Sequence, residues 1–142
     1  MKKKKNEQTD ITSTITLKAL SILSKTSCTK PNNYLDWNAI VSKNGETRTD
    51  HILRHTIPNN SRKSHGVFTG NPFDMVNTAW KHRHLIHPVS DGIGGTIYNI
   101  PYKNAGYESG YINTGTTLDY ITIITLENSS ALITAFPSLG NY

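Results

Sequence analysis

The sequence predicts an α+β fold, in which N-terminal helices pack on a C-terminal antiparallel β-sheet meander of about four strands. Two observations support this fold class. Apolar residues at helical spacing occur before Gly95, whereas short β-type runs separated by turn residues follow it. The 142 residues fit one domain, and the lean apolar content of 35% is compensated by Thr, Ser and Asn rather than by charge, so a core can form.

Three longer helices are expected before Gly95. The first, "ITSTITLKALSILSK" (11–25), has apolar positions that fit no single period well. The second, "YLDWNAIVSK" (34–43), places Leu35 and Ala39 on one side and ends at an Asn-Gly pair. The third, "PFDMVNTAWKHRHL" (72–85), begins with proline and has a regularly spaced apolar face: Met75, Val76, Ala79 and Trp80.

A shorter helix is expected at "HILRH" (51–55), with Thr49 or Asp50 as its N-cap. The following residues 56–64 contain one proline and two asparagines and therefore indicate a loop. "SDGIGG" (90–95) is typical of a turn.

Four strands are expected after that turn. They are "TIYNIPY" (96–102), "YESGYI" (107–112), "LDYITIIT" (118–125) and "ALITAF" (131–136), and each connection contains turn residues. In the last strand, alternation places Leu132, Thr134 and Phe136 on one face. The opposite face, with Ala131, Ile133 and Ala135, is small or apolar and is expected to face the core.

The net charge of +5 is unevenly distributed. Lys2–Lys5 are expected to be a solvated tail, and without them the chain is close to neutral. Between Arg48 and Lys103, however, there are seven Lys or Arg residues and all six histidines, but only three acids. This basic middle is consistent with a phosphate-binding site.

The single cysteine, Cys28, excludes an intrachain disulfide and a cysteine-based zinc site. The basic run at the start is followed by polar residues instead of an apolar segment, so no signal peptide is expected. No stretch has the roughly 18 apolar residues that a membrane helix needs.

The histidines form two clusters. His51 and His55 are four residues apart and share one helical face, but the Glu that completes the zinc motif H-E-x-x-H is missing. The second cluster, His82, His84 and His87, contains two basic residues whose charges oppose a bound metal ion. We therefore interpret the second cluster as a solvated basic helix end, which leaves contact with phosphate open.

The stretch "HILRHTIPNNSRKSHGVF" (51–68) combines three imidazoles with Arg54, Arg62 and Lys63. Cleavage of RNA without a metal needs a base for the 2′-OH proton, an acid for the leaving oxygen and a cation for the phosphorane charge. Histidine can serve as base or acid because its pKa lies near neutrality. Thr134 could donate to a phosphate and Phe136 could stack on a base, although a buried strand near a sheet edge would show the same pattern.

These segments together resemble a known family. "HILRH", then "KSHGVF", a small helix, a β meander and a closing "LITAFP" are similar to the C-terminal ribonuclease toxin domains of bacterial contact-dependent inhibition and polymorphic toxin systems. The likeness is to the EndoU-like branch of the barnase/EndoU/colicin/RelE (BECR) group. It covers about residues 48–138. From this resemblance and the polar, basic start of the chain, we expect a flexible basic tail at 1–11 and a single ribonuclease toxin domain at 12–142, with a helical part at 12–47 and the catalytic part at 48–138.

The resemblance also implies a set of site residues. Its catalytic set of two histidines and a lysine corresponds to His51, His65 and Lys103, and its Thr-x-aromatic pair corresponds to Thr134 and Phe136. The remaining candidates for substrate contact are Arg54, Arg62, Lys63 and Ser138.

Two departures from the family pattern leave alternatives open. The usual glycine-rich approach to the second histidine is replaced by Asn59, Asn60 and Ser61, and Phe136 stands where tyrosine is commoner, which puts uridine preference in doubt. The related ribonuclease A-like toxins have "RH" early and "TAYP" late. That pattern selects His55, with Arg62 or Lys63 as its partner, so sequence alone does not choose between His51 and His55.

The function implied by the resemblance is an antibacterial toxin. It would be a metal-independent endoribonuclease without a cofactor, with tRNA as the expected substrate and a 2′,3′-cyclic phosphate as the product. Such a toxin acts in the cytoplasm of a target bacterium after delivery as the C-terminal part of a larger secreted or cell-surface protein. Its partner would be an acidic immunity protein that covers the basic cleft. The alternatives are a ribonuclease A-like toxin and a non-catalytic basic module that binds RNA or protein.

Overall fold

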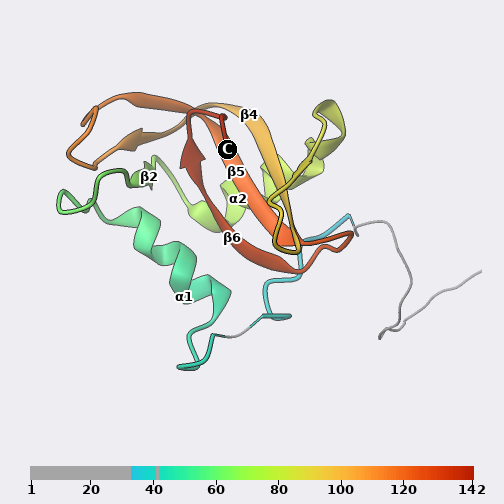
Figure 1. Cartoon of the computed structure of the whole chain (residues 1–142). Coiled ribbons are helices and arrows are strands. Elements are labelled where there is room, and N and C mark those ends of the chain that lie inside the picture. The colour runs from blue at the N-terminus through green and yellow to red at the C-terminus, as the bar shows by residue number, and fades with distance from the viewer. Residues whose placement is uncertain (1–32, 41) are drawn as a thin grey trace, which may run out of the picture. The chain divides into compact units, whose positions relative to one another are not determined.

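The computed structural model describes residues 33–40 and 42–142 (Figure 1). The chain divides into two units, Met1–Lys30 and Pro31–Tyr142, and all described residues belong to the second unit. The expected tail at 1–11 and the expected helix at 11–25 therefore lie outside the described residues.

The described part is α+β, as the sequence predicts, with short helices and an antiparallel sheet. Its helical elements are α1 (Arg48–Leu53), α2 (Pro72–Lys81) and the 3₁₀ turns η1 (Arg54–Thr56) and η2 (Arg83–Leu85). Its strands are β2 (Gly66–Phe68), β3 (Val89–Ser90), β4 (Gly95–Glu108), β5 (Thr117–Leu126) and β6 (Leu132–Ser138). The strand order is β2-β4-β5-β6, and β3 pairs separately with β4. Among the described residues no helix has the length and apolar character needed to span a bilayer.

Helix α1 begins one turn earlier than predicted. Its N-cap is Thr47, whose side chain accepts a hydrogen bond of 3.1 Å from the Asp50 backbone N–H. The predicted caps, Thr49 and Asp50, lie inside the helix, so that prediction was wrong. The N-cap residue is the one that can satisfy an otherwise unpaired N–H of the first turn, and only Thr47 has this position.

Helix α2 is predicted correctly at its start. Pro72 is the first residue, and the Asn71 side chain accepts from the backbone N–H groups of Phe73 and Asp74. The predicted apolar face is buried, and Trp80 meets Tyr98 of β4 edge to face at 4.9 Å between ring centroids. The α-helix ends at Lys81, however, and the rest of the predicted range continues as η2.

The predicted helix at 34–43 is wrong. Asp36 forms a parallel bridge with Ala131, in which its N–H donates to Ser130 O at 2.8 Å and its C=O accepts from Leu132 N at 3.0 Å. Only Leu35 of the segment's described residues is buried, and Ala39 is exposed. The backbone groups are thus satisfied by pairing with a distant segment, which local apolar spacing does not reveal.

Strand β4 is longer than predicted and includes only the first two residues of the expected strand at 107–112; residues 109–112 form no strand, so that prediction was wrong. It pairs with β5 up to Pro101 and again from Gly106, with an irregularity between these residues. Asn104 has φ 55° there, and its N–H donates to the Asp119 side chain at 2.8 Å. The expected Lys103–Gly106 turn is therefore a bulge inside one strand, and the chain reverses after Glu108 instead.

Strand β6 also contains an irregularity, and this changes the predicted faces. The register against β5 shifts between Ile124 and Thr125, so Leu132 and Ala135 both lie in the core. Ile133, which simple alternation assigns to the core, is only partly buried, so the predicted faces were wrong at both Leu132 and Ile133. Thr134 and Phe136 remain together outside the core, as predicted.

Two glycines allow strands β2 and β4 to approach β6 closely. A Cβ atom on Gly66 would lie 2.3 Å from the Pro137 carbonyl oxygen, and one on Gly106 would lie 2.7 Å from Pro137 Cβ. Because real side chains do not tolerate such distances, these positions require glycine. The approach brings His65, directly before β2, alongside β6.

Candidate active site

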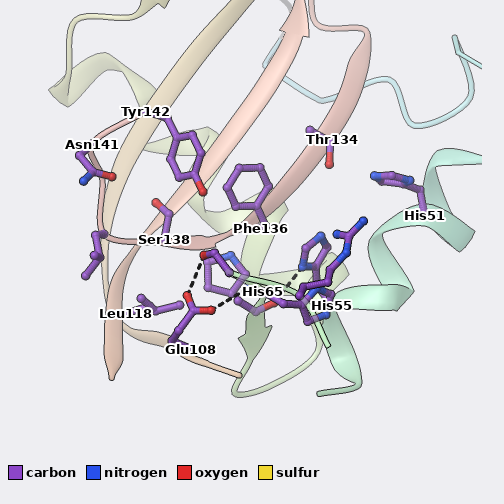
Figure 2. A pocket seen from close by; sticks show the side chains of 15 residues that line it. His51, His55, His65, Glu108, Leu118, Thr134, Phe136, Ser138, Asn141 and Tyr142 are labelled. Atoms are coloured by element: carbon purple, nitrogen blue, oxygen red, sulfur yellow. Dashed lines mark hydrogen bonds between the residues drawn. The ribbon is translucent and has the colours of Figure 1, made fainter. Parts of the chain in front are cut away.

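A cavity of about 440 Å³ lies among α1, η1, β2, β6 and the C-terminal residues (Figure 2). It brings together seven of the site residues that the sequence predicts: His51, His55, Arg62, His65, Thr134, Phe136 and Ser138. It is also lined by residues that sequence reasoning did not select, among them Glu108, Asn141 and Tyr142.

His55 occupies the centre of a stack of rings. Its ring lies on that of His65, with centroids 4.7 Å apart and planes at 14°, and Phe136 lies 5.7 Å away from it. Its Nδ1 is 2.8 Å from the Gly66 carbonyl oxygen, so Nδ1–H is the donor. This tautomer leaves Nε2 as an acceptor, and no described residue bonds to it. The stack and the hydrogen bond together fix the ring (Figure 2).

The environment keeps His55 uncharged. Burial lowers its pKa to about 4 against the hydrogen bond to Gly66, which opposes the effect, and coulombic interactions with His65, His51 and Arg62 lower it further. The imidazole is therefore neutral at pH 7. A neutral ring with an open Nε2 is the form that can accept a proton.

The low pKa of His55 predicts a loss of stability in acid. Between pH 6.5 and about 4 the unfolded chain binds a proton at this residue and the folded chain does not, so the free energy of unfolding decreases. The total decrease is up to about 3 kcal/mol, and it levels off below the folded-state pKa. Urea unfolding at a series of pH values measures it. His55→Phe, which cannot take up a proton, is the matched variant and should show a smaller decrease over this range; an equal decrease would contradict the assignment.

His65 is buried, and both its nitrogens are turned away from solvent. Nε2 lies 3.1 Å from the carbonyl oxygens of both Arg54 and Ile57, so it carries the proton and donates to them. Nδ1 is buried, with no hydrogen-bond partner among the described residues. The sequence suggests His65 as a proton-transfer group, but it presents a ring face to His55 instead of a nitrogen to the cavity.

Glu108 and Ser109 hold the residues before β2 in place. The Glu108 carboxylate accepts from the backbone N–H of His65 at 2.5 Å and from Gly110 N at 2.9 Å, and it also accepts from the Ser64 hydroxyl. The Ser109 hydroxyl donates to the His65 carbonyl at 2.8 Å. The available signal was a polar Glu-Ser-Gly inside the strand expected at 107–112.

His51 lies one helical turn before His55 and is partly buried. Its Nδ1 is 3.6 Å from a carboxylate oxygen of Glu46, and the second oxygen of that carboxylate pairs with Arg54. Burial and the charges of Arg48 and Arg54 lower the pKa of His51, while Glu46 raises it. The net effect is a lowered pKa for His51, and Glu46 opposes this lowering, whereas no carboxylate has this effect on His55.

The basic side chains that the sequence suggests for the site lie in different parts of the structure. Arg62 lines the cavity beside the histidines, and its guanidinium has no hydrogen bond or ion pair with the described residues. Arg54 is paired with Glu46, and Lys63 lines a separate hollow near Ile112. Lys103 is exposed in the bulge of β4 and is not among the residues that line the cavity.

The other end of the cavity is formed by β6 and the C-terminal residues. Thr134 is partly buried, and its hydroxyl bonds to none of the described residues. Phe136 meets Tyr142 edge to face at 4.9 Å (Figure 2). Ser138, in contrast, uses its hydroxyl in hydrogen bonds with Thr122 at 2.6 Å and with the N–H of Gly140 at 2.9 Å. The Ser138 hydroxyl thus stabilises the backbone at this end of the cavity, whereas the Thr134 hydroxyl is available to a ligand.

The second histidine cluster follows the end of α2 and does not line this cavity. The His82 and His84 rings are 6.5 Å apart, and the Arg83 guanidinium lies 4.4 Å above the Trp80 ring. Within residues 33–40 and 42–142, no three His, Cys, Asp or Glu side chains are grouped as a metal site would require. No protein-family model, curated protein or solved structure matches the chain.

Proposed function

We propose that this protein is an endoribonuclease that cleaves RNA by attack of the 2′-OH on the adjacent phosphorus. The observation that carries the proposal is the environment of His55. A neutral imidazole with an open Nε2 lies in one cavity with a second histidine and an unpaired guanidinium. These are the base, acid and cation that the reaction needs without help from a metal ion.

In this mechanism His55 Nε2 removes the proton of the 2′-OH. The 2′-oxygen forms a bond to phosphorus, and the bond between phosphorus and the 5′-oxygen of the next nucleotide breaks. Protonated His51 gives its proton to that 5′-oxygen, and Arg62 stabilises the charge on the non-bridging oxygens. The products are a 2′,3′-cyclic phosphate and a free 5′-hydroxyl.

The two histidines differ in the way this division of roles requires. Burial lowers the pKa of both histidines, that of His55 to about 4, but only His51 has a neighbouring carboxylate, that of Glu46, which opposes the lowering and favours the protonated form. We assign His65 to positioning, because it stacks on His55 and donates to the carbonyls of Arg54 and Ile57, at the start of η1 and directly after its end. Thr134 and Phe136 contact the nucleotide that carries the attacking hydroxyl, with Thr134 donating to phosphate and Phe136 stacking on the base.

The broader role that we propose is an antibacterial toxin of the EndoU-like kind within the BECR group, with tRNA as its target. It would act in the cytoplasm of a target bacterium and be neutralised by an acidic immunity protein. The supporting features are the histidine-bearing helix before an antiparallel meander and the Thr-x-Phe pair of β6 that faces the histidines.

The experiment that tests the activity is incubation with total RNA, with and without excess EDTA, followed by mapping of the fragment ends. We expect fragments with 2′,3′-cyclic phosphate and 5′-hydroxyl ends at equal rates in both conditions. Intact RNA would contradict the proposal, and RNA binding without cleavage would favour the non-catalytic module. Cleavage that stops with EDTA would point to a metal-dependent reaction.

A further inference from the structure

A second cavity, of about 390 Å³, adjoins the same histidines. It is lined by His51, Arg54, His55, Ile57, Pro58, Asn59, Arg62 and His65. Four of these residues also line the first cavity: His51, His55, Arg62 and His65. The groups to which we assign the chemistry therefore lie between two hollows.

The second cavity has an exposed apolar floor. The Ile57 side chain is 65% exposed, and Pro58 follows it. The backbone below this floor is nevertheless fixed, because the Ile57 carbonyl accepts from His65 Nε2 at 3.1 Å and the Asn59 N–H donates to the Ser109 hydroxyl at 3.0 Å. An exposed aliphatic side chain on an anchored backbone is a surface on which a flat ring can lie without further ordering of the protein.

Asn59 adds hydrogen-bonding groups beside this floor. Its side-chain oxygen accepts from both the backbone N–H and the hydroxyl of Ser61, at 3.1 and 2.6 Å. These two bonds identify the oxygen and turn the amide –NH₂ away from Ser61. No described residue accepts from this –NH₂, so its two donors are available to a ligand.

We propose that the second cavity binds the nucleoside on the 3′ side of the cleaved phosphate. Its base would lie on Ile57 and Pro58, and the Asn59 amide would donate to acceptors on the edge of that base. This inference rests on the proposed function and identifies the part of the substrate that the first cavity does not hold.

Cleavage inside an RNA strand requires a binding site for the nucleoside on each side of the reacting phosphate. The attacking 2′-oxygen and the leaving 5′-oxygen lie on opposite sides of the phosphorus atom, so the two nucleosides also lie on opposite sides of the reacting groups. The stack of His55 on Phe136 places the nucleoside with the 2′-OH in the first cavity. The leaving nucleoside then occupies the second cavity, on the other side of the histidines that both cavities share. An RNA strand can therefore pass through both cavities, as an endonuclease requires.

The test compares two substrates that share the first nucleoside. One is a dinucleoside monophosphate, and in the other a methyl group replaces the second nucleoside. Ile57→Ser should lower kcat/KM for the dinucleotide about tenfold, because apolar contact area is lost, and should leave the methyl ester unchanged. Ile93→Ser is the matched control, since Ile93 is 89% exposed in the turn before β4 and does not line either cavity; it should change neither rate.

A binding measurement separates this inference from the proposed activity. A dinucleotide that lacks the 2′-OH cannot be cleaved, and titration against it and against the matching 3′-mononucleotide reports the second cavity directly. We expect tighter binding of the dinucleotide and a selective loss of that advantage in Ile57→Ser. Equal affinities of the wild-type protein for both ligands, or equal weakening of both by Ile57→Ser, would overturn the second subsite. Selective binding without cleavage by the wild-type protein would instead contradict the proposed activity alone.

Discussion

His55→Gln is expected to lower kcat for RNA cleavage by about 10²–10⁴-fold, the usual effect of removing a proton-transfer group. Glutamine can still donate a hydrogen bond toward the Gly66 carbonyl, but its amide cannot accept the 2′-OH proton. The measurement is single-turnover cleavage of a labelled RNA at pH 7, where the wild-type imidazole is neutral because its pKa is about 4.

The matched control for this variant is His82→Gln. His82 is exposed at the end of α2 and also makes a hydrogen bond from its ring to a backbone carbonyl, that of Thr78 at 3.0 Å. It should cleave RNA at the wild-type rate. If His55→Gln retains the wild-type rate while circular dichroism shows an intact fold, His55 is not the base.

His51→Gln should lower RNA cleavage by a similar factor, about 10²–10⁴-fold, but for a different reason. We expect the loss to disappear when the leaving group is p-nitrophenolate, because this anion departs without being protonated. A nucleoside 3′-(p-nitrophenyl phosphate) provides such a substrate, and release of the coloured product measures its cleavage.

The base and acid variants serve as controls for each other in this experiment. His55→Gln should lose activity on both substrates, since the 2′-OH must be deprotonated in either case. An equal loss of both activities in His51→Gln would show that His51 does not act as the acid. If instead His51→Gln lost activity on both substrates and His55→Gln lost only RNA cleavage, His51 would be the base and His55 the acid.

The sequence alone locates the site approximately because its chemistry is concentrated in short segments. Three histidines and Arg62 lie within fifteen residues, and Thr134 and Phe136 share one face of a strand. These six side chains do line one cavity. Helix α2 is predictable for a similar reason, since its proline start and apolar face are local features.

The separate roles of the three histidines could not be predicted from the sequence. The roles depend on the Gly66 carbonyl, which fixes the tautomer of His55. They also depend on the carbonyls of Arg54 and Ile57, which accept the hydrogen bonds of His65 Nε2. Backbone carbonyls are present at every residue, so the sequence carries no sign of which of them a ring nitrogen will meet. Lys103 illustrates the same limit, because a bulge rather than a turn determines where it lies.

The sequence by itself thus determined the α+β class, helix α2, most of the strands and the set of groups available for proton transfer. Tertiary structure decided the bridge of Asp36 to Ala131 and the placement of Glu108 and Tyr142 at the cavity. Helix and strand formation follows from patterns within a few residues, whereas these contacts join residues up to ninety-five positions apart, as in Asp36 and Ala131. Their energies come from close approach and desolvation, which only the folded chain creates.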